Sequence, residues 1–208
     1  SILAQRYLKQ YPNGIYSHQA AAVQQSLAGN HVCITTATAS GKSLVFYTVG
    51  IELLNRVPNG TVLAIYPLKA LTDEQEQKWL QAVQHTQVPI EVGRIDGSVP
   101  MERRKHIMRK SSVVIMTPDV IHAWLLSNLN DRGISNFLAN LQLIVIDEAH
   151  TYSGVFGTNA AYLFRRLHHV ACQRGANPRY IAASATIEEP ADHLKRLTGQ
   201  QFSVIDNK

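Results

Sequence analysis

Short apolar runs recur along this 208-residue chain and alternate with stretches that suit helices. Several of the runs are apolar without alternation, which is typical of strands buried on both faces of a sheet. We expect strands at 32–34, 62–66, 90–92, 113–116, 143–146, 180–183 and 202–205. We expect helices at about 18–28, 42–55, 70–84, 101–109, 118–128, 158–173 and 189–198. This order predicts an α/β fold, a mostly parallel, doubly wound sheet with helices on both faces.

The length and composition suit one packed domain. Hydrophobic residues make up 45% of the chain and charged residues 17%, a balance that excludes a disordered chain. No apolar run approaches the roughly 20 residues that span a bilayer, and the first residues lack the layout of a signal peptide. We therefore expect a single domain over 1–208, in the cytoplasm and without a membrane partner. We also expect Cys33 and Cys172 to be buried thiols rather than a disulfide or a metal pair.

The charge balance favours polyanionic partners. The formal net charge is +5, and basic side chains release counterions when they meet phosphates. Many proteins are mildly basic, so this observation leaves other partners open. The basic run 103–110 is interpreted as a solvated helix face rather than a nucleic-acid patch. Trp79 and Trp124 suit helix packing better than base stacking, and His168 and His169 suit the surface better than a metal site.

Residues 36–43, Thr-Ala-Thr-Ala-Ser-Gly-Lys-Ser, join the expected strand at 32–34 to a helix-like run. A strand, a tight loop of small residues, Gly-Lys-Ser and a helix form a site that can hold a nucleoside triphosphate. Lys42 would reach the β- and γ-phosphates, and the Ser43 hydroxyl would bind Mg²⁺. Thr36 stands where the usual motif begins with glycine, so a chance Gly-Lys-Ser loop is the alternative. The predicted ATP-binding residues of this segment are Thr38, Ala39, Ser40, Gly41, Lys42 and Ser43.

Two carboxylates, Asp147 and Glu148, follow the apolar run 143–146. At the carboxyl end of a buried strand they would face the phosphate loop. Asp147 would hold Mg²⁺ through its water shell, and Glu148 would orient and deprotonate the water that attacks the γ-phosphate. With Lys42 they form the predicted catalytic set. The alternative is an acidic turn in solvent.

Two further segments offer polar side chains. Ser184 and Thr186 follow the run 180–183 and could hydrogen-bond the acidic segment, transmitting the state of the γ-phosphate, although Ser-Ala-Thr alone is common. Near the start of the chain, the amide of Gln19 offers a donor and an acceptor that match the edge of adenine. Ser17 is also a plausible helix N-cap, and that structural role competes for the same segment.

These segments resemble, in order, the motifs of one enzyme family. The matching segments are Gln19 in Tyr-Ser-His-Gln, 36–43, 66–71, 117–119, 147–150 and 184–186. They resemble the Q motif and motifs I, Ia, Ib, II and III of superfamily 2 DEAD/DEAH-box helicases. The wording at 38–43 and 150–157 is similar to bacterial mitomycin-repair helicases and their fungal RecQ-four-like relatives.

The resemblance implies a RecA-like P-loop NTPase domain, the first motor domain of an ATP-dependent helicase with ATP and Mg²⁺ as cofactors. It implies that His150 acts with Ser184 and Thr186 in coupling, and that single-stranded DNA is preferred over RNA. Lys69 can pair with a phosphate, and Thr117 can donate to phosphate oxygens. The nucleic-acid contacts implied by the resemblance are Pro67, Lys69, Gly97, Thr117, Pro118 and Asp119. Pro67 could equally be a proline that ends a strand.

Motifs IV to VI of the family do not occur in the chain. They belong to a second RecA-like domain, which supplies arginine fingers, so we expect that domain to be absent from this chain and the isolated domain to be nearly inactive. Two other functions stay open: an ATP-driven translocase or remodeller without strand separation, and a non-catalytic module that binds ATP or nucleic acid.

Overall fold

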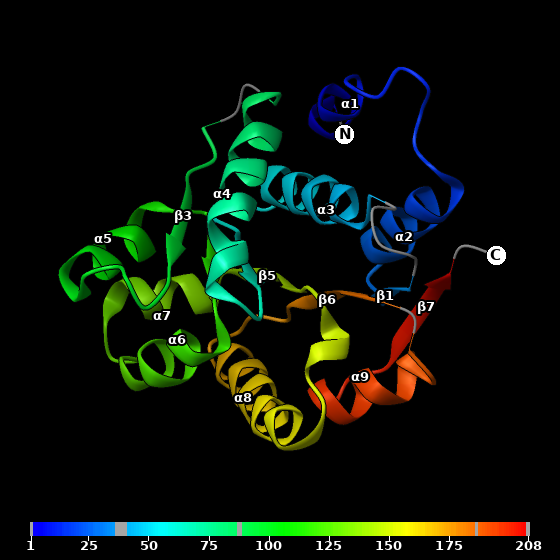
Figure 1. Ribbon diagram of the computed structural model, residues 1–208. Helices are drawn as coiled ribbons and strands as arrows, with labels where there is room; N and C mark the ends of the chain where they lie inside the picture. Colours follow the sequence, from blue (N-terminus) through cyan, green and yellow to red (C-terminus); the bar gives the residue numbers. More distant parts are fainter. Residues whose placement is uncertain (1, 36–40, 87–88, 186, 207–208) are drawn as a thin grey trace.

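A computed structural model describes residues 2–35, 41–86, 89–185 and 187–206 of the chain (Figure 1). Within these residues, seven strands form one sheet in the order β3-β4-β2-β5-β6-β1-β7, and every neighbouring pair is parallel. The predicted parallel, doubly wound sheet is confirmed. The strands are β1 (His31–Thr35), β2 (Thr61–Ile65), β3 (Val92–Ile95), β4 (Val113–Met116), β5 (Leu141–Ile146), β6 (Arg179–Ser184) and β7 (Phe202–Asp206).

Successive residues of each central strand point to opposite faces and build two separate cores. Leu63 of β2 belongs to one core and the next residue, Ala64, to the other. The core containing Ala64 is covered by α1 (Ile2–Leu8), α2 (Ser17–Leu27), α3 (Lys42–Arg56) and α4 (Lys69–Gln84). The core containing Leu63 is covered by α5 (Met101–Lys110), α6 (Pro118–Ala123), α7 (Arg132–Ala139), α8 (Gly154–Gln173) and α9 (Pro190–Thr198). The helices therefore lie on both faces of the sheet (Figure 1).

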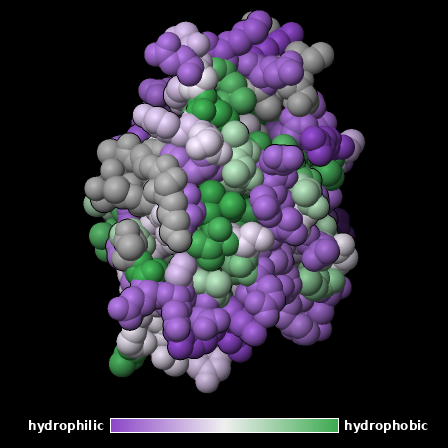
Figure 2. Space-filling model, turned by 90° about the vertical axis from the view of Figure 1, so that its right-hand side faces the viewer, coloured by the Kyte–Doolittle hydropathy of each residue, from purple (hydrophilic) through white to green (hydrophobic). Residues whose placement is uncertain are grey.

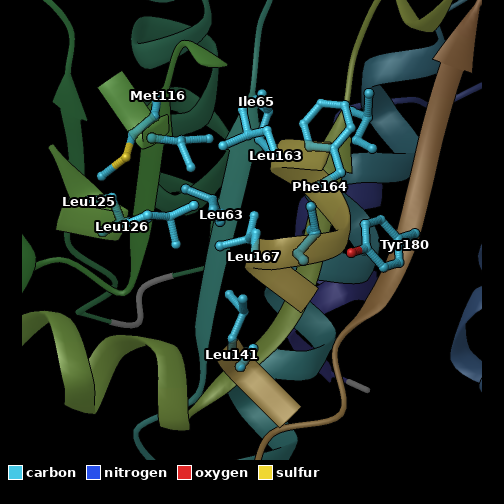
Figure 3. Close-up of a cluster of buried hydrophobic side chains, with 14 of the residues drawn as sticks. Leu63, Ile65, Met116, Leu125, Leu126, Leu141, Leu163, Phe164, Leu167 and Tyr180 are labelled. Carbon is cyan, nitrogen blue, oxygen red and sulfur yellow. The ribbon is translucent and has the colours of Figure 1, made fainter. Parts of the chain in front are cut away.

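Helix α8 shows how one of these cores is packed. Leu163, Phe164 and Leu167 project from α8 toward the side chains of β2, where Figure 3 shows them beside Leu63 and Ile65. Burial of each such side chain contributes about 1.5–3 kcal/mol. On the opposite face, Trp79 is fully buried, and Trp124 is 2% exposed in the α8 core, so the prediction that both rings serve packing is confirmed.

Several expected boundaries were wrong. Helix α7 begins at Arg132, where no helix was expected, because the Asp131 carboxylate caps it by accepting from the Gly133 and Ile134 N–H groups at 2.8 and 3.3 Å. Helix α8 starts at Gly154 rather than 158, since its two early glycines hid the periodic pattern. Strand β3 lies at Val92–Ile95 rather than 90–92.

Two further elements differ from the prediction. The helix expected at 118–128 is divided into α6 and a 3₁₀ turn, η1 (Leu125–Ser127). Helix α1 was not foreseen. Its Tyr7 is buried, and its ring contacts the Tyr47 ring edge-on at 6.3 Å.

Both cysteines are free thiols, but only Cys33 is buried as expected. Cys172 is exposed on α8, so that part of the prediction was wrong; its helical position points away from the sheet. His169 is exposed, whereas His168 is half-buried with its ring 5.7 Å from that of Tyr180. The basic residues of α5 are mostly exposed, which confirms the interpretation as a helix face, and Arg104 is half-buried with its guanidinium 5.7 Å from the Trp124 ring.

Strand β7 forms one edge of the sheet. Figure 2 views the side on which β7 lies in Figure 1 and shows a small apolar area surrounded by hydrophilic side chains. On β7, Val204 is 36% exposed, while Asp206 places an exposed charge at the end of the strand. A charge on an edge strand discourages pairing with another sheet. In the part of the chain that the structure describes, no helix has both the length and the apolar character needed to cross a membrane.

Replacing Phe164 by alanine is expected to lower the free energy of unfolding by about 3–5 kcal/mol, because it leaves a cavity between α8 and the sheet. Tyr162→Ala is the matched control, since Tyr162 is 74% exposed on the same helix. It should change the free energy of unfolding by less than about 0.5 kcal/mol. Urea denaturation followed by circular dichroism measures both variants. Equal losses would contradict the assignment of the two faces of α8.

Candidate functional site

The strand order brings three chemically distinctive segments to one edge of the sheet. Strands β5, β6 and β1 are neighbours, with Ile146 opposite Ala182 and Thr35 opposite Ser184. Because the strands are parallel, the segments that follow them emerge at the same carboxyl edge. These segments are the Gly-Lys-Ser loop after β1, Asp147 to His150 after β5, and the residues after Ser184. The predicted convergence of the three motifs is therefore present in the backbone.

Helix α3 begins inside the first of these segments. Gly41 precedes the helix with φ of 70°, a left-handed conformation that glycine adopts without strain. A Cβ atom at this position would lie 2.6 Å from Nε2 of Gln19. Lys42 and Ser43 form the first turn of the helix, whose N–H groups and dipole favour an anion. Thr38, Ala39 and Ser40 lie outside the described residues, and their predicted roles stay predictions.

Gln19 holds the start of α3 against the start of α2. Its Nε2 donates to the Gly41 carbonyl at 3.0 Å, and its Oε1 accepts from the Tyr16 N–H at 3.0 Å. The amide thus joins the backbone of Tyr16, three residues before it, to the backbone of Gly41, 22 residues after it. Ser17 is the first residue of α2, while Tyr16 occupies the N-cap, so the alternative in which Ser17 is the cap was wrong. The predicted contact of Gln19 with adenine stays a prediction.

Asp147 is influenced by Lys42, and both Asp147 and Ser43 act on Tyr47. Burial raises the pKa of Asp147 to about 6, against a lowering by the N–H of Glu148 and by the Lys42 ammonium. Burial also raises the pKa of Tyr47, which a hydrogen bond with Ser43 lowers and the Asp147 charge raises. Tyr47 was not singled out from the sequence; its position one turn after Ser43 on α3 was the available signal.

Glu148 has a strained backbone. Its φ and ψ are 48° and 46°, in the left-handed region that disfavours side chains with a Cβ by about 1–2 kcal/mol. Three hydrogen bonds hold it: its N–H donates to Asp147 Oδ1 at 2.9 Å, and its carbonyl accepts from the N–H and Oγ1 of Thr151 at 2.9 and 2.8 Å. Its side chain remains 38% exposed at the edge. Strain of this kind is concentrated at functional sites.

His150 connects the acidic segment to the end of β6. Its Nδ1 accepts from the Ala185 N–H at 3.2 Å and lies 3.3 Å from Glu148 Oε2. Ser184 is fully buried at the same strand end, and its Oγ makes no hydrogen bond within the described residues. Thr186 lies outside them. The structure thus gives His150 a contact with the segment after β6, while the contacts predicted for the two hydroxyl groups remain predictions.

His193 is a contact that sequence reasoning missed. It lies on α9, and its Nε2 is 3.0 Å from the carbonyl oxygen of Ala149, the residue after Glu148. Ala149 begins the short 3₁₀ helix η2 (Ala149–Thr151). His193 therefore connects α9 to the strained turn at Glu148 and Ala149. No local motif marks a histidine in this position, because the contact joins residues 44 apart in sequence.

The residues predicted to contact nucleic acid follow the other half of the same edge. Strands β3, β4 and β2 are neighbours, and Met116 lies opposite both Ile95 and Ile65. Lys69, Gly97 and Asp119 are exposed after these strands. Pro67 is half-buried, whereas Thr117 and Pro118 are buried at the N-terminus of α6, where proline suits the first helical turn. Their predicted contacts with nucleic acid remain untested.

A buried carboxylate, Asp96, connects the turn at Gly97 to the start of α4. The sequence did not predict this contact. Asp96 accepts from the Ser98 N–H at 2.7 Å and from Thr72 Oγ1 at 3.5 Å, and it pairs with the Arg94 guanidinium. Burial raises its pKa, but the bonds from Ser98 and the charge of Arg94 outweigh this and hold the pKa below its usual range. The start of α4 and the turn at Gly97 are therefore fixed by one side chain. An aspartate two residues before a turn serine is a recognisable turn signal.

The strand order and the motifs at the carboxyl edge define a class of protein, the RecA-like motor domain of a helicase. The family model for the DEAD/DEAH box helicase matches residues 16–194. The chain belongs to the DEAD/DEAH box helicase family.

Individual proteins agree with this assignment. The chain is 35% identical over 187 residues to the ATP-dependent helicase hrq1 of Schizosaccharomyces pombe, a match that covers 88% of this chain and 17% of that relative. It is 32% identical over 193 residues to the uncharacterized ATP-dependent helicase YprA of Bacillus subtilis, covering 93% of this chain and 26% of the relative. The chain thus spans only a small part of either relative.

A solved structure shares the whole fold. The crystal structure of the DUF1998 helicase MrfA bound to DNA and AMPPNP superimposes with a TM-score of 0.94 and 29% identity, covering 100% of this chain and 29% of that chain. The resemblance inferred from the motifs, to DEAD/DEAH-box helicases and to this branch of them, is confirmed.

Asp96→Asn is expected to destabilise the fold by about 3–5 kcal/mol at neutral pH, because Arg94 and Ser98 lose a buried carboxylate partner. Asp73→Asn is the matched control: Asp73 also pairs with Arg94, at 2.8 Å, but is 69% exposed and should change stability by less than about 1 kcal/mol.

The pH dependence of this effect has a defined sign. The folded state holds the pKa of Asp96 below its unfolded value, so its stabilisation is present above about pH 4 and is lost as the pH falls through the folded value. The stability gap between the unsubstituted chain and Asp96→Asn should therefore narrow on acidification below about pH 4. Urea denaturation at a series of pH values measures the gap, and a gap that widens on acidification would refute the role of the ionised carboxylate.

Proposed function

We propose that this chain is the ATP-binding motor domain of an ATP-dependent DNA helicase. The observation that carries the proposal is the strand order: Lys42 and Ser43, at the start of α3 after β1, and Asp147, directly after β5, lie at the same carboxyl edge of the sheet. A cation, a hydroxyl and a buried carboxylate at a helix N-terminus suit a metal–triphosphate. The S. pombe relative is named an ATP-dependent helicase, and the MrfA crystal structure contains AMPPNP.

The donor set fits Mg²⁺. Mg²⁺ prefers oxygen ligands and, in nucleotide sites, is held by one or two protein oxygens together with phosphates and water. Ser43 Oγ and the Asp147 carboxylate are such oxygens, and they would hold the ion. The ion would supply positive charge to the phosphates. The raised pKa of Asp147 fits this role, because a buried carboxyl without a full counter-charge is poised to gain one.

Glu148 would be the base that orients the attacking water. Its backbone is left-handed, and its carboxylate is partly exposed at the edge of the sheet. His150 contacts both Glu148 Oε2 and the Ala185 N–H. A movement of Glu148 would therefore displace His150 and, through it, the segment after β6. Ser184 and Thr186 would complete that coupling. Gln19 would contribute to recognition of the base while it holds the start of α3.

Single-stranded DNA would run over the half of the edge formed by β3, β4 and β2. Lys69 would pair with a phosphate, the turn at Gly97 would allow close approach, and the N-terminus of α6 after Thr117 would donate to phosphate oxygens. Pro67, Pro118 and Asp119 would shape this track. Such contacts follow the backbone and confer little sequence preference. Two crystal structures of MrfA contain DNA, which supports DNA over RNA.

The complete motor would need a second RecA-like domain. Residues 1–208 would form the first such domain, and the second would close on the edge that holds ATP and supply arginine side chains. Without them the chain should hydrolyse ATP roughly 10³–10⁵ times more slowly than the complete motor. The two free thiols support a reducing compartment such as the cytoplasm.

Lys42→Ala is expected to weaken binding of AMPPNP·Mg²⁺ by roughly tenfold to a hundredfold, because a charge-assisted contact with the phosphates is lost. Lys9→Ala, an exposed lysine just after α1, is the matched control and should bind as the unsubstituted chain does. Isothermal titration calorimetry measures both affinities. If Lys42→Ala retains full affinity, the phosphate-binding assignment is wrong.

Glu148→Gln should leave AMPPNP affinity within about twofold and lower the slow hydrolysis of ATP by roughly 10²–10⁴-fold, as expected for removal of a general base. Single-turnover hydrolysis with excess protein provides the rate. Glu102→Gln is the control, because Glu102 is an exposed carboxylate on α5, outside the three segments of the site. Unchanged hydrolysis in Glu148→Gln would remove Glu148 from the catalytic set.

A further inference from the structure

The outer face of α8 carries large exposed side chains that the proposed function does not use. Val155 is 81% exposed, Phe156 43% and Tyr162 74%. Along the helix, Val155, Asn159, Tyr162, Arg166 and His169 follow one another at spacings of four and three residues, so they share one side. We call this row of five residues the α8 stripe. A single exposed ring needs no explanation, whereas neighbouring exposed apolar side chains on one surface mark an interaction site.

The charge of this helix has one sign. Residues 154–173 contain Arg165 and Arg166 and no aspartate or glutamate. Both arginines are exposed: Arg165 donates one N–H to the Arg196 carbonyl at 2.7 Å, and Arg166 donates one to the Leu126 carbonyl at 3.2 Å. A guanidinium has five N–H groups, so each of these bonds orients the side chain while using one of them. A surface that interleaves aromatic rings with arginines suits a polyanion with flat bases.

A groove connects the stripe to the edge of the sheet. It has a volume of about 470 Å³, lies between α6 and α8, and is lined by Pro118, Asp119, His122, Phe156, Tyr162 and Arg166 among others. Pro118 and Asp119 directly follow Thr117 and belong to the predicted nucleic-acid track. A single DNA strand that passes the predicted contacts at 117–119 would therefore reach the groove first and the α8 stripe next. The Asp119 carboxylate, at the α6 end of the groove, repels phosphates. The DNA strand would therefore turn its bases, and not its phosphates, toward Asp119.

Tyr162 also borders a second groove. That groove has a volume of about 510 Å³, lies between α8 and α9, and is lined on its far side by His193, Arg196 and Leu197. Arg165 lies within it, and Arg196 is exposed. Tyr162 thus forms a ridge between two grooves, with arginines on both sides of it. This arrangement places a stacking ring between two sets of phosphate-binding groups.

We propose that the α8 stripe, together with the neighbouring Arg165, is a further contact surface for single-stranded DNA. A base would stack on Tyr162, while Arg165 and Arg166 would bind the flanking phosphates. The surface extends the track across the sheet edge beyond Asp119 and onto the side of the domain. It rests on the proposed function, because it needs DNA on the edge at 117–119. Stacking on a tyrosine ring is tolerant of sequence, since every base has an aromatic face.

The test uses the 208-residue chain and a fluorescein-labelled oligothymidylate followed by fluorescence anisotropy. Tyr162→Ala is expected to weaken binding about fivefold or more, whereas Tyr162→Phe, which keeps the ring, should bind as the unsubstituted chain does. Arg165→Ala should lower the slope of log affinity against log salt by about 1. Lys9→Ala, far from α8, is the matched control for loss of a positive charge and should leave the slope unchanged.

A photochemical readout is independent of affinity. An oligonucleotide containing bromodeoxyuridine should cross-link to the peptide that contains Tyr162, and cross-links confined to the segments around Lys69 and Thr117 would overturn the proposal. The remaining results separate it from the proposed function. If Lys69→Ala weakens DNA binding and Tyr162→Ala does not, the α8 proposal fails and the track stands. If the unsubstituted chain binds no DNA while it binds AMPPNP, both the track and the stripe are wrong.

A protein partner is the competing occupant. If Tyr162→Ala leaves DNA binding intact but abolishes a self-association seen by analytical ultracentrifugation, the stripe is a contact between copies of the chain, and the DNA proposal is overturned.

Discussion

The parallel register of β5, β6 and β1 is the constraint on which the rest of the site depends. Backbone hydrogen bonds between these strands set Thr35 beside Ser184 and Ile146 beside Ala182. Three segments that are distant in sequence therefore emerge within reach of one another. A shift of one residue in any of the three would turn its buried side chains to the wrong core and move its loop along the edge. The positions of the segments that carry Lys42, Asp147 and Glu148 are thus set by the two cores that fix the strands.

The sequence was most informative where a feature repeats or is local. Short apolar runs predicted all seven described strands to within a few residues, and the runs of the five central strands are unbroken because those strands are buried on both faces. The ordered motifs predicted the family for the same reason: each is a short string with its own chemistry. Boundaries failed where a single side chain decides them. The Asp131 cap begins α7 where no helix was expected, and glycines at 154 and 157 concealed the start of α8.

Contacts between distant segments could not be read from the sequence. Asp96 joins the turn at Gly97 to Thr72 on α4, and His193 reaches Ala149 from α9. Each residue looks ordinary in its own segment, and its role exists only once the sheet brings the elements together. The exposure of Tyr162 and Cys172 has the same origin, since a helix pattern shows that one side is buried without showing whether another element covers the opposite side. Asp96 and His193 position the segments that carry the motifs, whereas the motifs contain the candidate reactive groups.

The left-handed backbone of Glu148 has a consequence for evolution and engineering. Glycine at this position would relieve the steric conflict of the Cβ atom and would suit the turn better than glutamate does. A selection for heat resistance alone should therefore drift toward glycine at 148 and discard the carboxylate with it. A glutamate that withstood such a selection would be a residue kept for what it does, at the expense of what the fold would choose.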